Sequence, residues 1–159
     1  MRVGSGFDIH RLVAGRPLIL GGVEIEHGRG LEGHSDADVL AHAVADALLG
    51  AIGAGDLGTH FPASEERWRD AAGALILAEV LRRVGEAGYR IGNLDATVIA
   101  EEPRLSPWLD AIRGGLAEML SLDQSRLNVK LKSADRLGAV GRGEGIAAQA
   151  VVLLEEIAG

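Results

Sequence analysis

Three residues in the first part of the chain have the side chains and spacing of a divalent-metal site. Asp8 and His10 lie two residues apart, so in a strand they project from one face, while Ile9 turns to the opposite, buried face. His42 lies in a segment with helical periodicity and supplies a third ligand. Two imidazoles and one carboxylate leave a fourth tetrahedral position open, as in catalytic zinc sites. The alternative is that His42 is a hydrogen-bonded core residue and that the Asp-x-His spacing is accidental.

The helix that would carry His42 is apolar on nearly every side. Between residues 38 and 52 only Asp38, His42 and Asp46 interrupt the apolar ridges, and their spacing of four places them in a single stripe. A buried helix tolerates polar groups only where they have partners, and a bound metal would be such a partner. Ser35 is predicted to cap this helix, with acids in its first turn.

Periodicity and turn residues predict the elements that must position these side chains. Strands are expected at residues 3–10, 89–100, 127–131 and 146–154, a hairpin at 17–25 turning at Gly21-Gly22, and further helices at 68–86 and 106–120. The glycine-rich run 141–145 is read as a turn, because it lacks the lysine of a phosphate-binding loop. Helices and strands do not alternate strictly, which favours an α+β sandwich. We expect a mostly four-stranded mixed sheet with helices on one face, as in ferredoxin-like folds.

Composition bounds the function. The 159 residues are 47% hydrophobic, which predicts one globular domain over residues 1–159. A formal charge of −7 argues against nucleic-acid binding, and the absence of cysteine leaves imidazole and oxygen as the metal ligands. Charged residues in the first dozen positions interrupt any signal-peptide core, and no apolar run is long enough to span a membrane. We therefore expect a cytoplasmic protein that does not bind membranes.

Five ordered segments carry a family resemblance. They are Gly-Phe-Asp-Ile-His at residues 6–10, His-Ser-Asp-Ala-Asp at 34–38, Asp-Ala-Leu-Leu-Gly at 46–50, Gly-Asp-Leu-Gly at 55–58 and the glycine-rich run at 138–145. In this order and spacing the chain resembles the 2-C-methyl-D-erythritol 2,4-cyclodiphosphate synthases. The resemblance implies cyclisation of 4-diphosphocytidyl-2-C-methyl-D-erythritol 2-phosphate with release of CMP, in the non-mevalonate route to isoprenoids. It also implies a homotrimer with active sites shared between neighbouring subunits.

The resemblance also assigns roles to individual residues. It implies zinc at Asp8, His10 and His42 and a second divalent metal, magnesium or manganese, at Asp135, and these four are the expected catalytic residues. The expected substrate-binding residues are His34 and Ser35 for phosphate, Asp56 and Gly58 for the erythritol, Ala100, Glu101, Glu102, Pro103, Arg104 and Leu105 around the cytidine with Arg104 near the phosphates, Lys132 and Ser133 near the diphosphate, and Arg142. The attacking oxygen belongs to the substrate, so catalysis is mainly alignment and charge stabilisation.

Two of these assignments have alternatives. Ser35 could bind phosphate, cap the helix, or do both. Asp46 could lie near the substrate, although we favour a role as hydrogen-bonding support for His42.

The chain departs from its relatives in one region. Relatives usually read Asn-Val-Lys-Ala-Thr-Thr-x-Glu where residues 128–135 read Asn-Val-Lys-Leu-Lys-Ser-Ala-Asp, and Ala139 replaces a usual phenylalanine. The acid at Asp135 is thus one methylene shorter, and Lys132 either brings charge to the phosphates or points to solvent. Ala139 leaves open whether the trimer-axis cavity, where Arg142 is retained, takes a regulatory isoprenoid diphosphate.

Two other functions remain alternatives at this point. One is a zinc-containing protein that binds a cytidine nucleotide without turnover. The other is a metal-dependent phosphohydrolase, in which the open position on zinc carries an attacking water.

Overall fold

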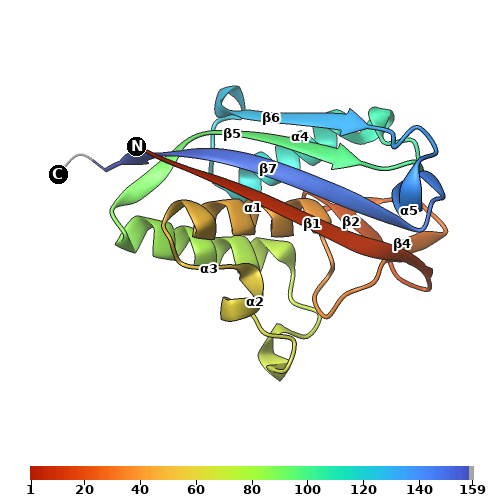
Figure 1. Ribbon diagram of the computed structural model, residues 1–159, viewed down its shortest axis with the longest axis horizontal. Coiled ribbons are helices and arrows are strands. Elements are labelled where there is room, and N and C mark those ends of the chain that lie inside the picture. Colours follow the sequence, from red (N-terminus) through yellow and green to blue (C-terminus); the bar gives the residue numbers. More distant parts are fainter. Residues whose placement is uncertain (158–159) are drawn as a thin grey trace.

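A five-stranded mixed sheet forms one layer of the molecule and helices form the other (Figure 1). The computed structural model describes residues 1–157, and its strand order is β4-β1-β7-β5-β6. All neighbouring strands are antiparallel except β5 and β6, which are parallel. The strands are β4 (Arg29–Leu31), β1 (Arg2–Ala14), β7 (Gly145–Glu156), β5 (Tyr89–Ile99) and β6 (Leu127–Lys132). The four long strands confirm the predicted sheet, and the short β4 adds an edge strand that periodicity did not indicate.

The helices are short, and three of them carry most of the packing. They are α1 (Val39–Ala51), α3 (Gly73–Glu86) and α4 (Leu109–Met119), with single turns α2 (Leu57–His60) and α5 (Gly138–Gly141). Short 3₁₀ turns occupy Glu66–Trp68, Ser106–Trp108 and Gln124–Arg126. β2 (Leu18–Leu20) and β3 (Val23–Ile25) pair around Gly21-Gly22, as predicted. The helix predicted at 68–86 begins only at Gly73, because the chain leaves a 3₁₀ turn and is extended at Arg69 and Ala72.

Helix α1 lies close against strand β1 because the strand has glycine at the two points of contact. A Cβ atom at Gly4 would lie 1.9 Å from the carbonyl oxygen of Ala47, and one at Gly6 would lie 2.0 Å from that of Ala43. Only glycine permits this approach of two backbones. The packing brings the His42 turn of α1 beside Asp8 and His10, so it builds the site directly.

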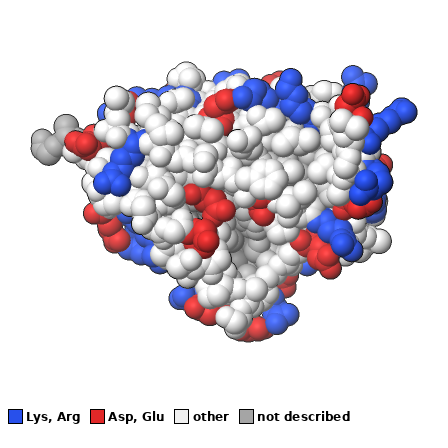
Figure 2. All heavy atoms as spheres, in the orientation of Figure 1, with Lys and Arg blue, Asp and Glu red and all other residues white. Residues whose placement is uncertain are grey.

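The opposite face of β1 is open. Phe7 and Ile9 are 58% and 49% exposed, and Val3 and Val151 of the same face are also exposed. The prediction that Ile9 is buried is therefore wrong for the isolated chain, since the helices cover only the face that carries Gly4 and Gly6. In Figure 2 uncharged residues cover much of this view, a group of acidic side chains lies near its middle, and most Lys and Arg side chains lie toward the rim.

One hydrophobic core lies between the sheet and the helices, and aliphatic side chains make up nearly all of it. Eleven of the thirteen residues of α1 are buried, which explains why the helix is apolar nearly all round. Among residues 1–157, no helix is both long and apolar enough to cross a membrane.

Candidate metal centre and its pocket

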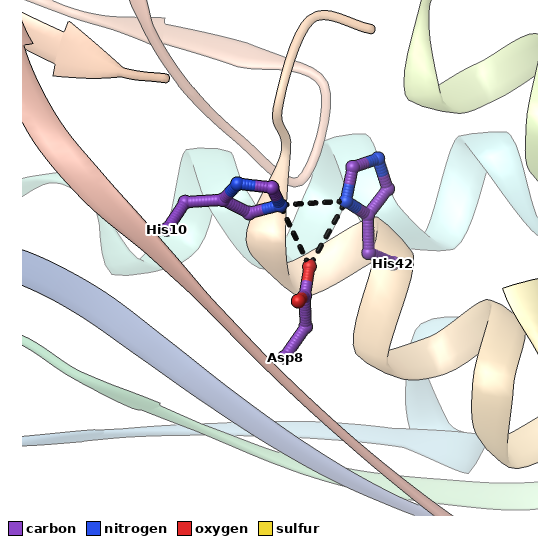
Figure 3. Close-up of side chains that lie close together, drawn as sticks. All are labelled: Asp8, His10 and His42. Carbon is purple, nitrogen blue, oxygen red and sulfur yellow. Dashed lines mark hydrogen bonds and ion pairs between the residues drawn. The ribbon is translucent and has the colours of Figure 1, made fainter. Parts of the chain in front are cut away.

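Asp8, His10 and His42 converge as the sequence predicts (Figure 3). The Asp8 Oδ2 atom lies 2.9 Å from His10 Nε2 and 3.0 Å from His42 Nδ1, and the two nitrogens are 3.1 Å apart. One potential ligand atom from each residue lies within 4.8 Å of the others. Strand β1 presents two of these side chains from one face, and α1 presents the third across the gap that Gly6 keeps narrow. Two imidazole nitrogens and one carboxylate oxygen fit a tetrahedral divalent cation with an open position.

Hydrogen bonds on the far side of each imidazole orient the rings. His10 Nδ1 lies 2.7 Å from the carbonyl oxygen of Glu32, which can only accept, so Nδ1 carries the hydrogen and Nε2 keeps its lone pair for a metal. His42 Nε2 lies 3.0 Å from the Ser35 hydroxyl, which also accepts from the backbone N–H of Ala37. When Ser35 accepts the His42 Nε2–H, the Nδ1 lone pair points at Asp8.

The charge on Asp8 and its pairing with the two imidazoles suit this group to bind a cation. Burial opposes ionisation of Asp8, but hydrogen bonds from His10 and His42 outweigh it and hold the pKa of Asp8 well below its usual range. Burial likewise opposes charge on His10, while the bond to Asp8 raises the pKa of His10 above its ordinary value. The hydrogen bonds to Asp8 need a hydrogen on His10 Nε2 or on His42 Nδ1, and a cation held by the three side chains would take the place of that hydrogen.

The other polar residues of the α1 stripe have different partners from those predicted. Asp38, not Ser35, is the N-cap of α1, because its carboxylate accepts from the N–H groups of Leu40 and Ala41 and also from the Gly21-Gly22 turn. Asp46 does not support His42. Its carboxylate accepts a 2.7 Å hydrogen bond from the N–H of Leu57, and burial raises its pKa. The support for His42 comes from Ser35 instead.

A cavity of about 350 Å³ opens beside the metal group, and Figure 2 shows a hollow flanked by acidic side chains on this face. The polar part of its lining combines Asp46 with residues that the sequence singled out as site residues. These are Asp8, His10, His34, Ser35, His42, Asp56 and Gly58. The apolar part of its lining is formed by Leu57, Phe61, Trp68 and Ile76. The rings of Phe61 and Trp68 meet edge to face with centroids 4.7 Å apart.

Sequence reasoning missed this apolar wall. Phe61 and Trp68 are two of only five aromatic residues in the chain and lie seven positions apart, and that clustering was the available signal. Arg16 was also missed. Its Nη2 donates a 2.7 Å hydrogen bond to the carbonyl oxygen of Ser35, which fixes the loop that orients His42.

The residues expected to hold the cytidine lie apart from the metal group within one chain. Ala100, Glu101, Pro103, Arg104, Leu105, Lys132 and Ser133 line a separate cavity of about 210 Å³ at the ends of β5 and β6. Glu102 instead forms an ion pair with Arg29, and Arg142 pairs with Glu144 at 2.6 Å. The single chain therefore presents two separate cavities.

Asp135 lies in the exposed loop after β6 and has a left-handed backbone, with φ of +51°, followed by Arg136 with φ of +60°. Its N–H donates a hydrogen bond to the Ser133 hydroxyl. This bond links the two residues that are predicted to bind the diphosphate and its metal. Asp is one of the few side chains that populate this backbone region readily, so the short acid suits the conformation.

Comparison with known proteins identifies the family. The YgbB family model matches residues 1–155. The 2-C-methyl-D-erythritol 2,4-cyclodiphosphate synthase of Geobacillus kaustophilus is 56% identical over 155 residues, which are 98% of each chain. A solved structure of a synthase of this name with CDP bound has a TM-score of 0.89 at 37% identity and covers 97% of this chain and 100% of its own. A CDP complex of the Plasmodium falciparum protein has a TM-score of 0.86 at 33% identity, covering 99% and 97%. On this agreement of sequence and fold, the chain belongs to the YgbB family of 2-C-methyl-D-erythritol 2,4-cyclodiphosphate synthases.

Proposed function

We propose that the protein converts 4-diphosphocytidyl-2-C-methyl-D-erythritol 2-phosphate to 2-C-methyl-D-erythritol 2,4-cyclodiphosphate and CMP, in the non-mevalonate route to isoprenoid precursors. The observation that carries the proposal is the Asp8–His10–His42 group at the wall of a cavity that also holds His34, Ser35 and residues 56–58. A ligand in this cavity contacts a cation site on one side and an apolar wall on the other. The family to which the chain belongs supplies the reaction.

The ligand set supports zinc as the first metal, at about one ion per subunit. When bound, zinc supplies a Lewis acid that polarises a phosphate oxygen and offsets the charge gathered during cyclisation. The protein's own residues hold the donor atoms in place, since Glu32 fixes the His10 tautomer and Ser35 orients His42. We expect His34 and the Ser35 hydroxyl to receive a phosphate next to that position, while Asp56 and Gly58 contact the erythritol.

The cytidine half-site completes the proposal from a neighbouring subunit. Related structures hold CDP, and in this chain the segment from Ala100 to Leu105 forms a cavity of its own with Ser133 and Lys132. Asp135 would hold a second divalent metal, magnesium or manganese, against the diphosphate, because carboxylate oxygens are the ligands such ions prefer. The open apolar face around Phe7 and Ile9 supports a homotrimer, since burying that face removes apolar area from water. A cytoplasmic location and a single domain over residues 1–159 stay predictions.

The proposal is tested by measuring CMP release from the purified protein. We expect release in the presence of zinc and magnesium and its loss after chelation, with recovery when both metals are restored. Asp8→Asn should lower kcat by orders of magnitude, because it removes the charged ligand of the first metal. CMP release at the same rate in Asp8→Asn and wild type would contradict a role for this site.

A further inference from the structure

Helix α2 carries the predicted erythritol contacts at one rim of the cavity, yet it has no buried residue of its own. Its N-cap Asp56 is exposed and accepts hydrogen bonds from Thr59, which stabilise the turn but tie it to nothing outside. An isolated helical turn of four residues is unstable in water. The position of α2 therefore depends on contacts between this turn and the rest of the fold.

Two side chains outside α2 supply polar anchors. At its start, Asp46 of α1 accepts from the Leu57 N–H, as described above. At its end, Arg83 of α3 donates from Nη1 to His60 Nδ1 over 3.0 Å, and His60 Nε2 donates to the Ala54 carbonyl over 2.6 Å. Both nitrogens of the His60 ring are therefore used. Nε2 binds the loop that precedes α2, and Nδ1 joins the end of α2 to α3.

Arg83 is itself fixed in this position. Its Nε donates over 3.0 Å to Glu79 Oε1 one turn earlier on α3, and both side chains are only about a third exposed or less, at 33% and 26%. A guanidinium that is held by a carboxylate has lost most of its rotamer freedom before it meets His60, so the further bond costs little entropy. His60 and Arg83 are half-buried, which shields their bond from competing water.

We propose that His60 and Arg83 are positioning residues that hold α2 at the cavity and so set the places of Asp56 and Gly58. The inference rests on the proposed function, because it assigns these two residues to the erythritol side of the same site. His60 follows Gly58 by two residues, so a displacement at the Arg83 contact moves the backbone that lines the cavity. Neither residue touches the metal group, and their effect on the reaction is through α2 alone.

The chain offers a matched control for the test. Arg82 lies next to Arg83 on α3 and also binds Glu79, but it is 51% exposed and its bonds go to Glu79 and Glu86 on the same helix. Arg83→Gln and Arg82→Gln therefore remove the same charge from the same helix, and only the first breaks the contact with α2. His60→Ala removes the acceptor, whereas His60→Asn keeps an acceptor oxygen close to the place of Nδ1.

The experiment measures kinetics and backbone hydrogen exchange on the intact protein with both metals present. Arg83→Gln and His60→Ala should raise KM about tenfold with kcat within about twofold. The reason is that both variants displace α2, whose residues Asp56 and Gly58 contact a part of the substrate that does not react. Exchange at residues 54–60 should be faster in both, while zinc content stays at the wild-type value. Arg82→Gln should match wild type, and His60→Asn should recover most of the loss.

Equal KM and equal exchange in Arg83→Gln and Arg82→Gln would overturn the inference. If wild type released no CMP, the proposed function would fail, but the exchange comparison would still decide whether Arg83 fastens α2. A fall in kcat with unchanged KM and unchanged exchange would also contradict a positioning role.

Discussion

At the level of single residues, the metal group depends on partners that the ligand pattern does not reveal. The Asp8, His10 and His42 triad was predicted from spacing together with the family resemblance, and its ligand atoms lie within 4.8 Å of one another, which confirms that the three side chains converge. The groups that turn the two imidazoles toward Asp8 are a backbone carbonyl at Glu32 and the hydroxyl of Ser35. A carbonyl has no sequence signature, and a serine before a helix is as readily interpreted as a cap.

Removing an imidazole should empty the site. We expect His42→Ala and His10→Ala to purify with far less than the roughly one zinc per subunit of wild type, because two remaining ligands hold zinc weakly. Elemental analysis after dialysis measures this. His27→Ala is the control, since His27 lies outside the metal group, and it should keep its zinc. Unchanged zinc in His42→Ala would show that the site is assigned wrongly.

Asp135 tests the second metal. Asp135→Asn should lower turnover by orders of magnitude with zinc content intact, since it removes charge from the proposed magnesium position alone. Asp135→Glu should have a mild effect, because it keeps the carboxylate and changes only its reach at a left-handed backbone position. Turnover is measured at limiting magnesium. Wild-type rates in Asp135→Asn under those conditions would move the second-metal role to another residue.

At the level of elements, the contact between α1 and β1 decides where His42 lies. Gly6→Ala would place a methyl group 2.0 Å from the Ala43 carbonyl oxygen, so the helix must shift away from the strand. We expect the free energy of unfolding to fall by about 1–3 kcal/mol, the usual cost of overpacking, and zinc to bind more weakly. Gly28→Ala is the matched control, because a Cβ there meets nothing within 4 Å. Denaturant midpoints that agree for the two variants would contradict this account.

Periodicity predicted the elements that have strong amphipathic or alternating patterns. It failed where tertiary contacts decide where a helix begins and which residue caps it. The strand at 146–154, the hairpin at Gly21-Gly22 and the body of α1 were all predicted correctly. The start of α3 was placed five residues too early, since the apolar residues before it continue the pattern, although Trp68 lines the cavity instead of belonging to the helix. The α1 cap was misassigned because Ser35 and Asp38 both suit a cap, whereas the helix begins directly after Asp38, whose carboxylate also accepts from the Gly21-Gly22 turn.

At the level of the whole molecule, each chain carries two separate cavities and one open apolar sheet face. The metal cavity and the cavity at Ala100 to Leu105 have no lining residue in common. Strand alternation indicated which residues share a face, but it could not show that the face with Phe7 and Ile9 lacks a helical cover. A trimer that joins one half-site to the other across subunits would account for both features.

Mixed subunits test the shared site. His42→Ala and Arg104→Glu should each be inactive as pure proteins, because each damages one half of every site. Trimers formed by refolding the two together should regain partial activity, since some interfaces then join two intact halves. Mass spectrometry confirms that mixed trimers form. Mixed trimers without activity would argue that each chain works alone.

The central claim is that the substrate cyclises within the protein without an attacking water, and phosphorus NMR of the products tests it most directly. Incubation of the purified protein with 4-diphosphocytidyl-2-C-methyl-D-erythritol 2-phosphate, zinc and magnesium should give CMP and the two coupled signals of a cyclic diphosphate in equal amounts. The His42→Ala protein, treated in the same way, should leave the substrate unchanged. Inorganic phosphate or a linear product from wild type would contradict the account in favour of a phosphohydrolase, and an unchanged spectrum would favour a protein that only binds the nucleotide.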